Sequence, residues 1–319
     1  LDNIYLSNLR KISGQLNVNN NTRLTILNID NLNEIGEFRT INNPSMGQVT
    51  FRNISSIDVI QIVQSNVTQL GIVSDDDIKS VEITFNKNLD SFGFPNLTKV
   101  DGYVLFSDNG NNGKVSFPEL TSIKGNCSFS GLSELDIGKL QTVGSDFSLV
   151  NNGFKNITIK TLKSTGDAVS INNNNNLENI TFPNLSGIGG ALSIQNNSRL
   201  VHLYDNSFPK LAEIDGAVQI MGPIDNVSFP SIKSMKGGFY LYSTGDIDCS
   251  AVKKNISSYA ANKLQTCESN VKNSSTGSKG SSKSGGSDDS QSDAIAIFNP
   301  IQYVGILSTA ALVAGSFLF

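Results

Sequence analysis

The residues of this chain that could carry chemistry are its cysteines, its one histidine and its carboxylates. Cys127, Cys249 and Cys267 are odd in number, so at least one is free or has a partner outside this sequence. His202 has no second histidine or cysteine near it in the repeat register described below. A metal site or a Ser-His pair therefore has little support, and we predict that His202 is an exposed turn residue.

Hydrolysis of a polysaccharide would need paired carboxylates at a set separation, or a metal ion with a base. At the outward strand positions we find Asp146 alone among small and neutral residues, while Asp101 and Asp215 lie singly elsewhere. Three consecutive aspartates at 75–77 lack the spaced ligands of a calcium loop and predict a solvated turn. No phosphate-binding loop, nucleophile elbow or zinc-protease motif occurs. We therefore predict no catalytic residue, no metal, no cofactor and no small-molecule substrate.

Asparagine carries the clearest chemical signal, because the chain contains twelve Asn-x-Ser/Thr sequons. Such sequons are the acceptors of N-linked sugar chains in secreted proteins. A single sequon means little, whereas a dozen favour a secreted, heavily glycosylated protein. The predicted acceptors are Asn20, Asn53, Asn66, Asn96, Asn126, Asn156, Asn179, Asn184, Asn196, Asn226, Asn255 and Asn273.

The C-terminal region predicts a lipid anchor. Residues 294–319 carry no charge, and they follow a Ser- and Gly-rich segment at 268–293. Small residues, a polar spacer and a terminal apolar tail form a GPI-attachment signal, whose tail is removed when the lipid is added. We expect attachment at Ser292, with Gly285 as the alternative. A short tail anchor is disfavoured, because the apolar core at 304–319 has 16 residues and about 20 are needed to span a bilayer.

A GPI signal is useful only in a protein that enters the secretory route. We therefore expect that a signal peptide and an N-terminal cap precede this sequence. With 319 residues and 38% hydrophobic residues, the chain can bury a substantial core. Its net charge of −4 does not provide the basic surface of a nucleic-acid-binding protein, and we expect no nucleic-acid partner.

The chain is organised by an internal repeat of 20 to 26 residues, which sets the positions of the residues described above. Each unit begins with an apolar residue and has a second apolar residue three positions later. A strand with period-two alternation follows. The units open at Phe94, Phe117, Ile137, Ile159, Phe182, Phe208 and Phe229. The first inward column of the strands is Val104, Cys127, Phe147, Val169, Leu192, Val218 and Phe239. The second is Phe106, Phe129, Leu149, Ile171, Ile194, Ile220 and Leu241.

Both columns face one interior, because side chains alternate faces along a strand. Single coils cannot bury their apolar faces, but stacked coils share one core. The sequence thus predicts an all-β solenoid. The same register recurs near the start of the chain, and we lose it between residues 73 and 90.

Runs of asparagine, such as residues 172–176, end several of the predicted strands. Asparagine tolerates left-handed backbone, so these runs predict turns. Stacking of side-chain amides from coil to coil would add a hydrogen-bonded ladder.

Cys249 and Cys267 bracket the end of the repeats, where a solenoid needs a cap over its open end. We predict a disulfide between them, worth about 3 kcal/mol. Two free thiols, the alternative, are unfavourable in an oxidising compartment. Cys127 lies in the inward column and is predicted to be a small buried hydrophobe.

The repeat resembles the receptor L-domain, a leucine-rich-repeat-like right-handed β-helix. The whole layout resembles the fungal GPI-anchored family involved in cell-wall organisation and sporulation. The resemblance rests on the Phe-Pro-x-Leu-x-x-Ile-x-Gly units at 94–102, 117–125, 182–190 and 208–216, on the strand-plus-Asn segment 191–197, on Cys249 and Cys267, and on the stalk and tail. It implies a cell-surface role in wall assembly and names no catalytic residues.

These observations predict four segments: a solenoid at 1–248, a disulfide-closed cap at 249–267, a stalk at 268–293 and a removable tail at 294–319. We expect an extracellular, non-catalytic protein that contributes to cell-wall organisation and is held to the plasma membrane or wall by its lipid. The alternatives are a ligand-binding surface receptor domain and, third, an enzyme that modifies wall polysaccharide.

One face of the predicted sheet is poor in charge and, after Asn126, free of sequons. We hypothesise that it meets wall glucan or a wall protein, with an aromatic ring as a stacking platform. A plain solvated sheet is the alternative. Asn156, Asn179 and Asn226 recur on a different face. The candidate contact residues are Ser148, Ser170, Ser193, Gln219 and Tyr240.

Overall fold

The computed structural model describes residues 2–51, 54–71, 77–110, 113–260 and 264–269. The predicted stalk beyond residue 269, the apolar tail, Ser292 and Gly285 lie outside the described residues, as do Asn53 and Asn273. The predicted turn at 75–77 is described at Asp77 alone.

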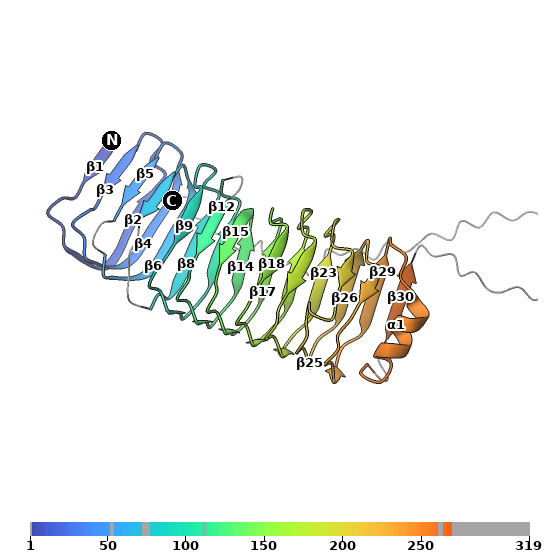
Figure 1. Cartoon of the computed structure of the whole chain (residues 1–319). Helices are drawn as coiled ribbons and strands as arrows, with labels where there is room; N and C mark the ends of the chain where they lie inside the picture. Colours follow the sequence, from blue (N-terminus) through green and yellow to red (C-terminus); the bar gives the residue numbers. More distant parts are fainter. Residues whose placement is uncertain (1, 52–53, 72–76, 111–112, 261–263, 270–319) are drawn as a thin grey trace, which may run out of the picture. The chain divides into compact units, whose positions relative to one another are not determined.

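The described residues form a parallel β-solenoid of about 11 turns, as the repeat predicts (Figure 1). Its largest layer is a 12-stranded parallel sheet to which each coil gives one strand. In spatial order its strands are β2 (Lys11–Asn19), β4 (Glu34–Asn43), β6 (Ser56–Ser65), β8 (Ser80–Thr84), β11 (Val104–Ser107), β14 (Cys127–Ser130), β17 (Phe147–Val150), β20 (Val169–Asn172), β23 (Leu192–Gln195), β26 (Val218–Gly222), β29 (Phe239–Ser243) and β30 (Gln265–Ser269).

Shorter parallel sheets form the other sides of the coils. The seven-stranded sheet contains β10 (Lys99–Val100), β13 (Ser122–Ile123), β16 (Thr142–Val143), β19 (Ser164–Thr165), β22 (Gly187–Ile188), β25 (Glu213–Ile214) and β28 (Ser234–Met235). The first coils carry β1 (Asn3–Tyr5), β3 (Ile26–Asn28), β5 (Gln48–Thr50) and β7 (Gln69–Gly71). Further along the chain, a three-stranded sheet contains β9 (Ser91–Gly93), β12 (Gly113–Ser116) and β15 (Leu132–Asp136). Two two-stranded sheets follow, β18 (Asn156–Thr158) with β21 (Asn179–Thr181) and β24 (His202–Leu203) with β27 (Asn226–Val227).

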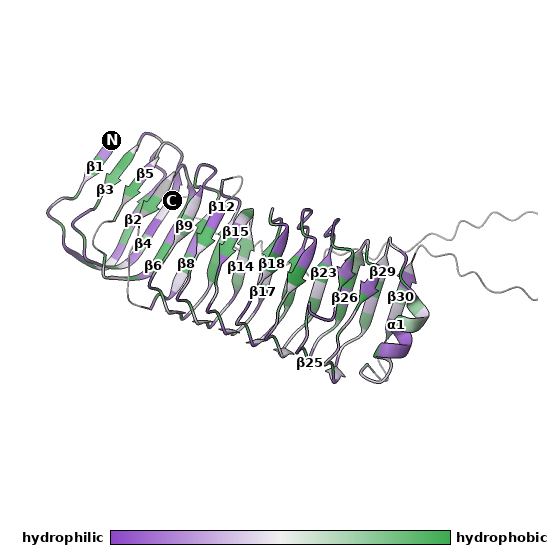
Figure 2. Ribbon diagram, viewed as in Figure 1, coloured by the Kyte–Doolittle hydropathy of each residue, from purple (hydrophilic) through white to green (hydrophobic). Residues whose placement is uncertain are grey.

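The predicted inward columns form the core in the predicted register. Val104 pairs with Cys127, and Cys127 with Phe147, and this pairing continues to Phe239. Both columns are buried throughout. Apolar residues recur in the strands of successive coils, as the hydropathy colouring of Figure 2 shows. Stacked phenylalanines at the unit starts add to this core, with the rings of Phe182 and Phe208 5.3 Å apart.

The register that the sequence analysis lost is continuous in the structure. β8 pairs with β11 so that Val81 lies beside Val104 and Ile83 beside Phe106. Both residues are buried. This coil therefore repeats the common strand pattern, although no Phe-Pro unit precedes it.

Backbones of successive coils approach closely at a glycine corner. A Cβ added to Gly166 would lie 2.0 Å from the carbonyl oxygen of Gly144, well inside contact distance. Glycine is needed at this corner because only a residue without a side chain allows so close an approach.

The strand ends turn through left-handed residues, as the asparagine runs predict. Asn151, Asn173 and Asn196 have φ values of 55°, 58° and 55°. The next residue of each coil points inward and is buried, as Asn174 and Asn197 illustrate. These inward side chains form a ladder of amide hydrogen bonds between coils, which confirms the predicted stacking of amides.

A cap covers the C-terminal end of the coils. Helix α1 (Cys249–Ile256) begins after Asp248, whose side chain accepts hydrogen bonds from the backbone N–H groups of Ser250 and Ala251. Its buried residues face the core cluster. The predicted disulfide joins Cys249 to Cys267, with their Cα atoms 5.5 Å apart. Cys267 lies in β30, which adds a last strand to the large sheet beside β29.

Candidate functional surface

The outer face of the 12-stranded sheet is the surface on which the candidate contact residues come together. Ser148, Ser170, Ser193, Gln219 and Tyr240 pair with one another in consecutive strands and form one row, which we call the serine row. All five side chains are half-buried, as expected for the solvent side of a sheet. The sequence-based placement of these residues on one face is thus correct, whereas their contact with a partner stays a hypothesis.

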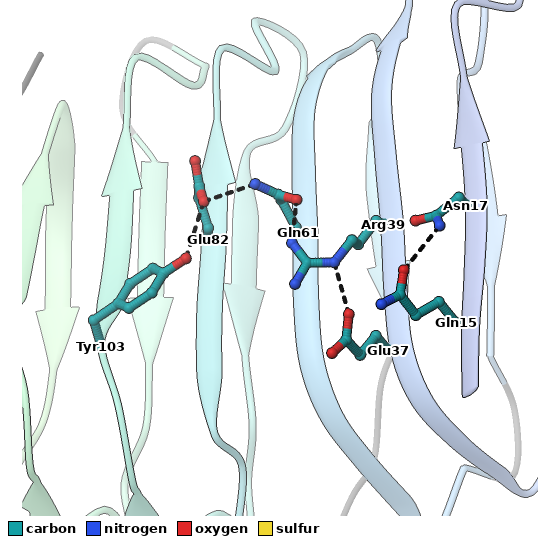
Figure 3. A network of polar contacts seen from close by, with 7 residues as sticks. All are labelled: Gln15, Asn17, Glu37, Arg39, Gln61, Glu82 and Tyr103. Atoms are coloured by element: carbon teal, nitrogen blue, oxygen red, sulfur yellow. Dashed lines mark hydrogen bonds and ion pairs between the residues drawn. The ribbon is translucent and has the colours of Figure 1, made fainter. Parts of the chain in front are cut away.

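The same face carries a polar network over its N-terminal strands, which we call the amide–ion network. Arg39 on β4 is its centre: its Nε donates to a carboxylate oxygen of Glu37 at 2.8 Å. Its Nη1 donates to the amide oxygen of Gln61, on the next strand, at 2.6 Å. The network comprises Gln15, Asn17, Glu37, Arg39, Gln61, Glu82 and Tyr103 (Figure 3).

The chain of bonds continues to β8 and then to Tyr103, directly before β11. The amide nitrogen of Gln61 donates to Oε2 of Glu82 at 3.0 Å. The hydroxyl of Tyr103 donates to the same oxygen at 3.2 Å. On the other side of Arg39, the amide of Asn17 donates to Gln15 at 3.0 Å. Polar side chains thus follow one another across the face from β2 to Tyr103, and those from Glu37 to Tyr103 are joined by hydrogen bonds.

Burial sets the electrostatics of this network. Glu82 is 6% exposed, although it points to the outer side of the sheet. A carboxylate with so little contact with water needs hydrogen-bond donors, and Gln61 and Tyr103 supply them. Desolvation, and then the charge and the hydrogen bond of Glu82, raise the pKa of Tyr103 to about 12. Tyr103 therefore remains a donor at any physiological pH.

The prediction that Asp146 is the single carboxylate on the outward strand positions is wrong. Glu37 and Glu82 also lie on this face, and Glu82 belongs to the coil in which the sequence register was lost. Partial burial raises the pKa of Asp146, and the backbone N–H of Ala168 donates to it at 3.0 Å. Each of these three carboxylates is thus engaged by a donor from the protein.

Glycan acceptors lie on the surface in every case that the structure describes. None of the ten described sequon asparagines is buried. Asn156 and Asn179 are paired in β18 and β21, and the amide of Asn179 donates to Asn156 at 2.8 Å. Asn226 lies on the same side of the coils, where it pairs with His202. The predicted column of sequons away from the large sheet therefore exists, with His202 in place of an asparagine in the intervening coil.

His202 is not an exposed turn residue. It is half-buried in β24, its ring lies 4.9 Å from that of Tyr204, and its Nδ1 has no hydrogen-bond partner among the described residues. Within the described ranges, no group of three His, Cys, Asp or Glu side chains could hold a metal ion.

Cys127 is the free cysteine among the described residues and is fully enclosed in the core. Burial raises the pKa of its thiol, which keeps it protonated and unreactive. The prediction of a small buried hydrophobe is confirmed. Of the helical segments that the structure describes, none has the length and apolar character to cross a bilayer.

Comparisons with known proteins give relatives from fungi. The chain is 27% identical to "Protein ecm33" of Aspergillus fumigatus, over 88% of this chain and 70% of the relative. It is 27% identical to "Cell surface GPI-anchored protein" of Arthroderma benhamiae, over 92% and 80%. It is 30% identical to "Cell surface GPI-anchored protein ECM33" of Candida albicans, over 79% of this chain and 60% of that protein.

No family model and no solved structure matches the chain. The names of these relatives describe cell-surface or cell-wall proteins and mention no enzymatic activity.

Proposed function

Since this chain belongs to the family of fungal GPI-anchored cell-surface proteins that includes these relatives, we propose that it is a non-catalytic surface glycoprotein contributing to cell-wall organisation. The observation that carries the proposal is the similarity to such proteins over most of the chain. Surface sequons and a disulfide-closed cap are typical of secreted proteins and support it. The GPI lipid would hold the protein to the membrane, with attachment at Ser292 or, as the alternative, Gly285.

The experiment uses the full-length gene product in a fungal host. We expect the protein at the cell periphery, and we expect its deletion to make cells more sensitive to agents that stress the wall. Phospholipase C should release it from membranes with a C-terminal peptide that ends near Ser292 and bears ethanolamine phosphate. An intracellular protein, or a deletion strain with normal wall resistance, would refute the proposal.

The serine row is the part of the surface that we propose to contact the wall, through glucan or a wall protein. Its side chains are small or neutral, so the face is flat and low in charge. New sequons that place a glycan at Ser170 or Ser193 would block it, because both side chains point outward. Loss of wall resistance with normal secretion is expected. Full complementation by both variants would remove the serine row from the proposal.

Incubation of the purified protein with wall glucan tests the non-catalytic part of the proposal. We expect no change in the length of the glucan chains. Turnover that is lost on substitution of Glu37 or Glu82 would instead assign the protein to the enzymes that modify wall polysaccharide.

A further inference from the structure

We propose that the amide–ion network is a binding site for one extended, neutral polysaccharide chain that runs across the strands of the large sheet. This inference rests on the proposed function, because it names the class of ligand that a wall-associated solenoid would hold. It assigns the site to the N-terminal coils and to residues outside the serine row.

The geometry of the network matches a linear repeating ligand. Its members come from four adjacent strands, β2, β4, β6 and β8, and from Tyr103, which directly precedes β11, so five successive coils each give at least one polar side chain. Parallel strands are about 4.8 Å apart, so the network extends about 19 Å, close to the length of four or five sugar units in an extended chain. A polysaccharide that lies along this direction would present one sugar to each coil.

The chemistry of the groups favours hydroxyl-rich ligands. Amides, a guanidinium, carboxylates and a phenol offer both donors and acceptors, and they are already fixed in position by mutual hydrogen bonds. Pre-oriented groups lose little side-chain entropy when a ligand binds. Tyr103 adds a ring that is 38% exposed at one end of the site, where a sugar ring can pack.

Charge excludes the main alternative, an anionic ligand. The single cation, Arg39, is neutralised by Glu37 at 2.8 Å, and Glu82 adds a further negative charge beneath the surface. A phosphate, sulfate or acidic polymer would therefore meet a net repulsive site. The side chains of Arg39 and Glu37 are 31% and 28% exposed, so both remain within reach of a neutral ligand.

The position of the sequons is consistent with a ligand on this face and limits its length. Asn126 directly precedes β14, in the coil that follows Tyr103. Because Val104 pairs with Cys127, Asn126 lies beside Tyr103 in the neighbouring coil. A glycan on Asn126 would bound the site on its C-terminal side. Between β2 and β11, the described sequon residues Asn20, Asn66 and Asn96 lie outside the strands of the large sheet.

The test measures binding by isothermal titration calorimetry, with the full-length secreted protein and three probes. The probes are a neutral glucose pentasaccharide with β-1,3 links, a pentasaccharide of N-acetylglucosamine and, as the anionic control, a galacturonate pentasaccharide. We expect saturable binding of at least one neutral probe with little dependence on salt, and no binding of the galacturonate. Failure of both neutral probes, or preference for the anionic one, would overturn the proposal.

Two variants locate the site. Gln61→Ala removes the side chain that joins Arg39 to Glu82, and Tyr103→Ala removes the exposed ring. Both should weaken binding of the neutral probe at least tenfold. Ser170→Ala, on the same face but outside the network, is the matched control and should bind as the wild type does. Equal binding by all variants would refute the site.

Two controls keep the result interpretable. Urea unfolding midpoints show whether the Gln61 variant remains folded, and Gln61→Glu provides a second variant that keeps the size of the side chain but removes its donor to Glu82. Localisation in cells separates this inference from the proposed function. A protein that reaches the cell surface and supports the wall but ignores neutral pentasaccharides would refute the inference alone.

Discussion

Replacing Asn174 by alanine would test whether the buried amide ladder holds the coils together. Asn174 is fully buried, and its Oδ1 accepts the backbone N–H of Asn152 in the preceding coil at 2.8 Å. Its Nδ2 donates to the carbonyl oxygen of Leu149 at 3.0 Å. The substitution therefore leaves one backbone donor and one backbone acceptor without these partners in the interior.

The expected cost follows from those two groups. A buried polar group that loses its hydrogen-bond partner costs about 1–3 kcal/mol, so Asn174→Ala should lower the free energy of unfolding by about 2–6 kcal/mol. A water molecule in the vacated space would move the cost toward the lower value. Asn175→Ala is the matched control, because this neighbouring side chain is exposed, and surface substitutions usually change stability by less than about 0.5 kcal/mol.

Urea unfolding followed by circular dichroism gives both free energies, and the two variants should have the same slope against urea. Native-state hydrogen exchange adds local information, since the amide of Asn152 should exchange faster in Asn174→Ala than in the wild type. Equal unfolding midpoints for Asn174→Ala and Asn175→Ala would show that the ladder contributes nothing to stability, and the reasoning would be refuted.

Three further predictions follow from the cap, the core and the network. Reduction of the Cys249–Cys267 disulfide, which closes a loop with a sequence separation of 18, should lower the free energy of unfolding by about 3 kcal/mol; an unchanged urea midpoint in reductant would contradict this. Cys127 should resist a maleimide reagent in the native protein and react in urea, because it is buried and its pKa is raised; rapid native labelling would contradict its placement. Tyr103 has a raised pKa, so the stability that its neutral form provides is complete below pH 10 and is lost as pH rises through about 12. Free energies of unfolding across that window should fall less steeply for Tyr103→Phe than for the wild type, and parallel curves would argue against the prediction.

The core of the solenoid could be predicted from the sequence because its signal is repeated in every coil. Side chains such as Phe147, Val169 and Leu192 alternate strictly with small outward residues, and a slip by one position would turn each of them to solvent. The cap disulfide could also be predicted from the sequence. Because Cys127 was assigned to the interior, Cys249 and Cys267 were the two cysteines left to pair.

The amide–ion network could not be predicted in this way. Glu82 lies in a coil that no Phe-Pro unit precedes, so its outward position was visible only once the pairing of β8 with β11 was known. Arg39 and Gln61 are 22 residues apart, and nothing local signals that they meet. His202 was misplaced for a related reason: a single histidine gives no periodicity, and its position follows from pairing with Asn226.

The asparagine turns show the same limit on a smaller scale. Asparagine runs indicate left-handed turns, yet Asn173 is exposed while Asn174 is enclosed. Which amide points inward depends on the direction in which the chain leaves the preceding strand.

The repetition of the coil interface has an evolutionary consequence. Each strand of the large sheet bonds to the strand one coil away, and the glycine corner and amide ladder repeat the same contacts. Removal or duplication of a whole coil would leave two faces that still match, whereas a change of half a coil would place polar residues against the core. Genes for such proteins can therefore gain or lose length in single-coil steps. Each step would change the reach of the sheet by about 4.8 Å while the neighbouring coils keep their packing.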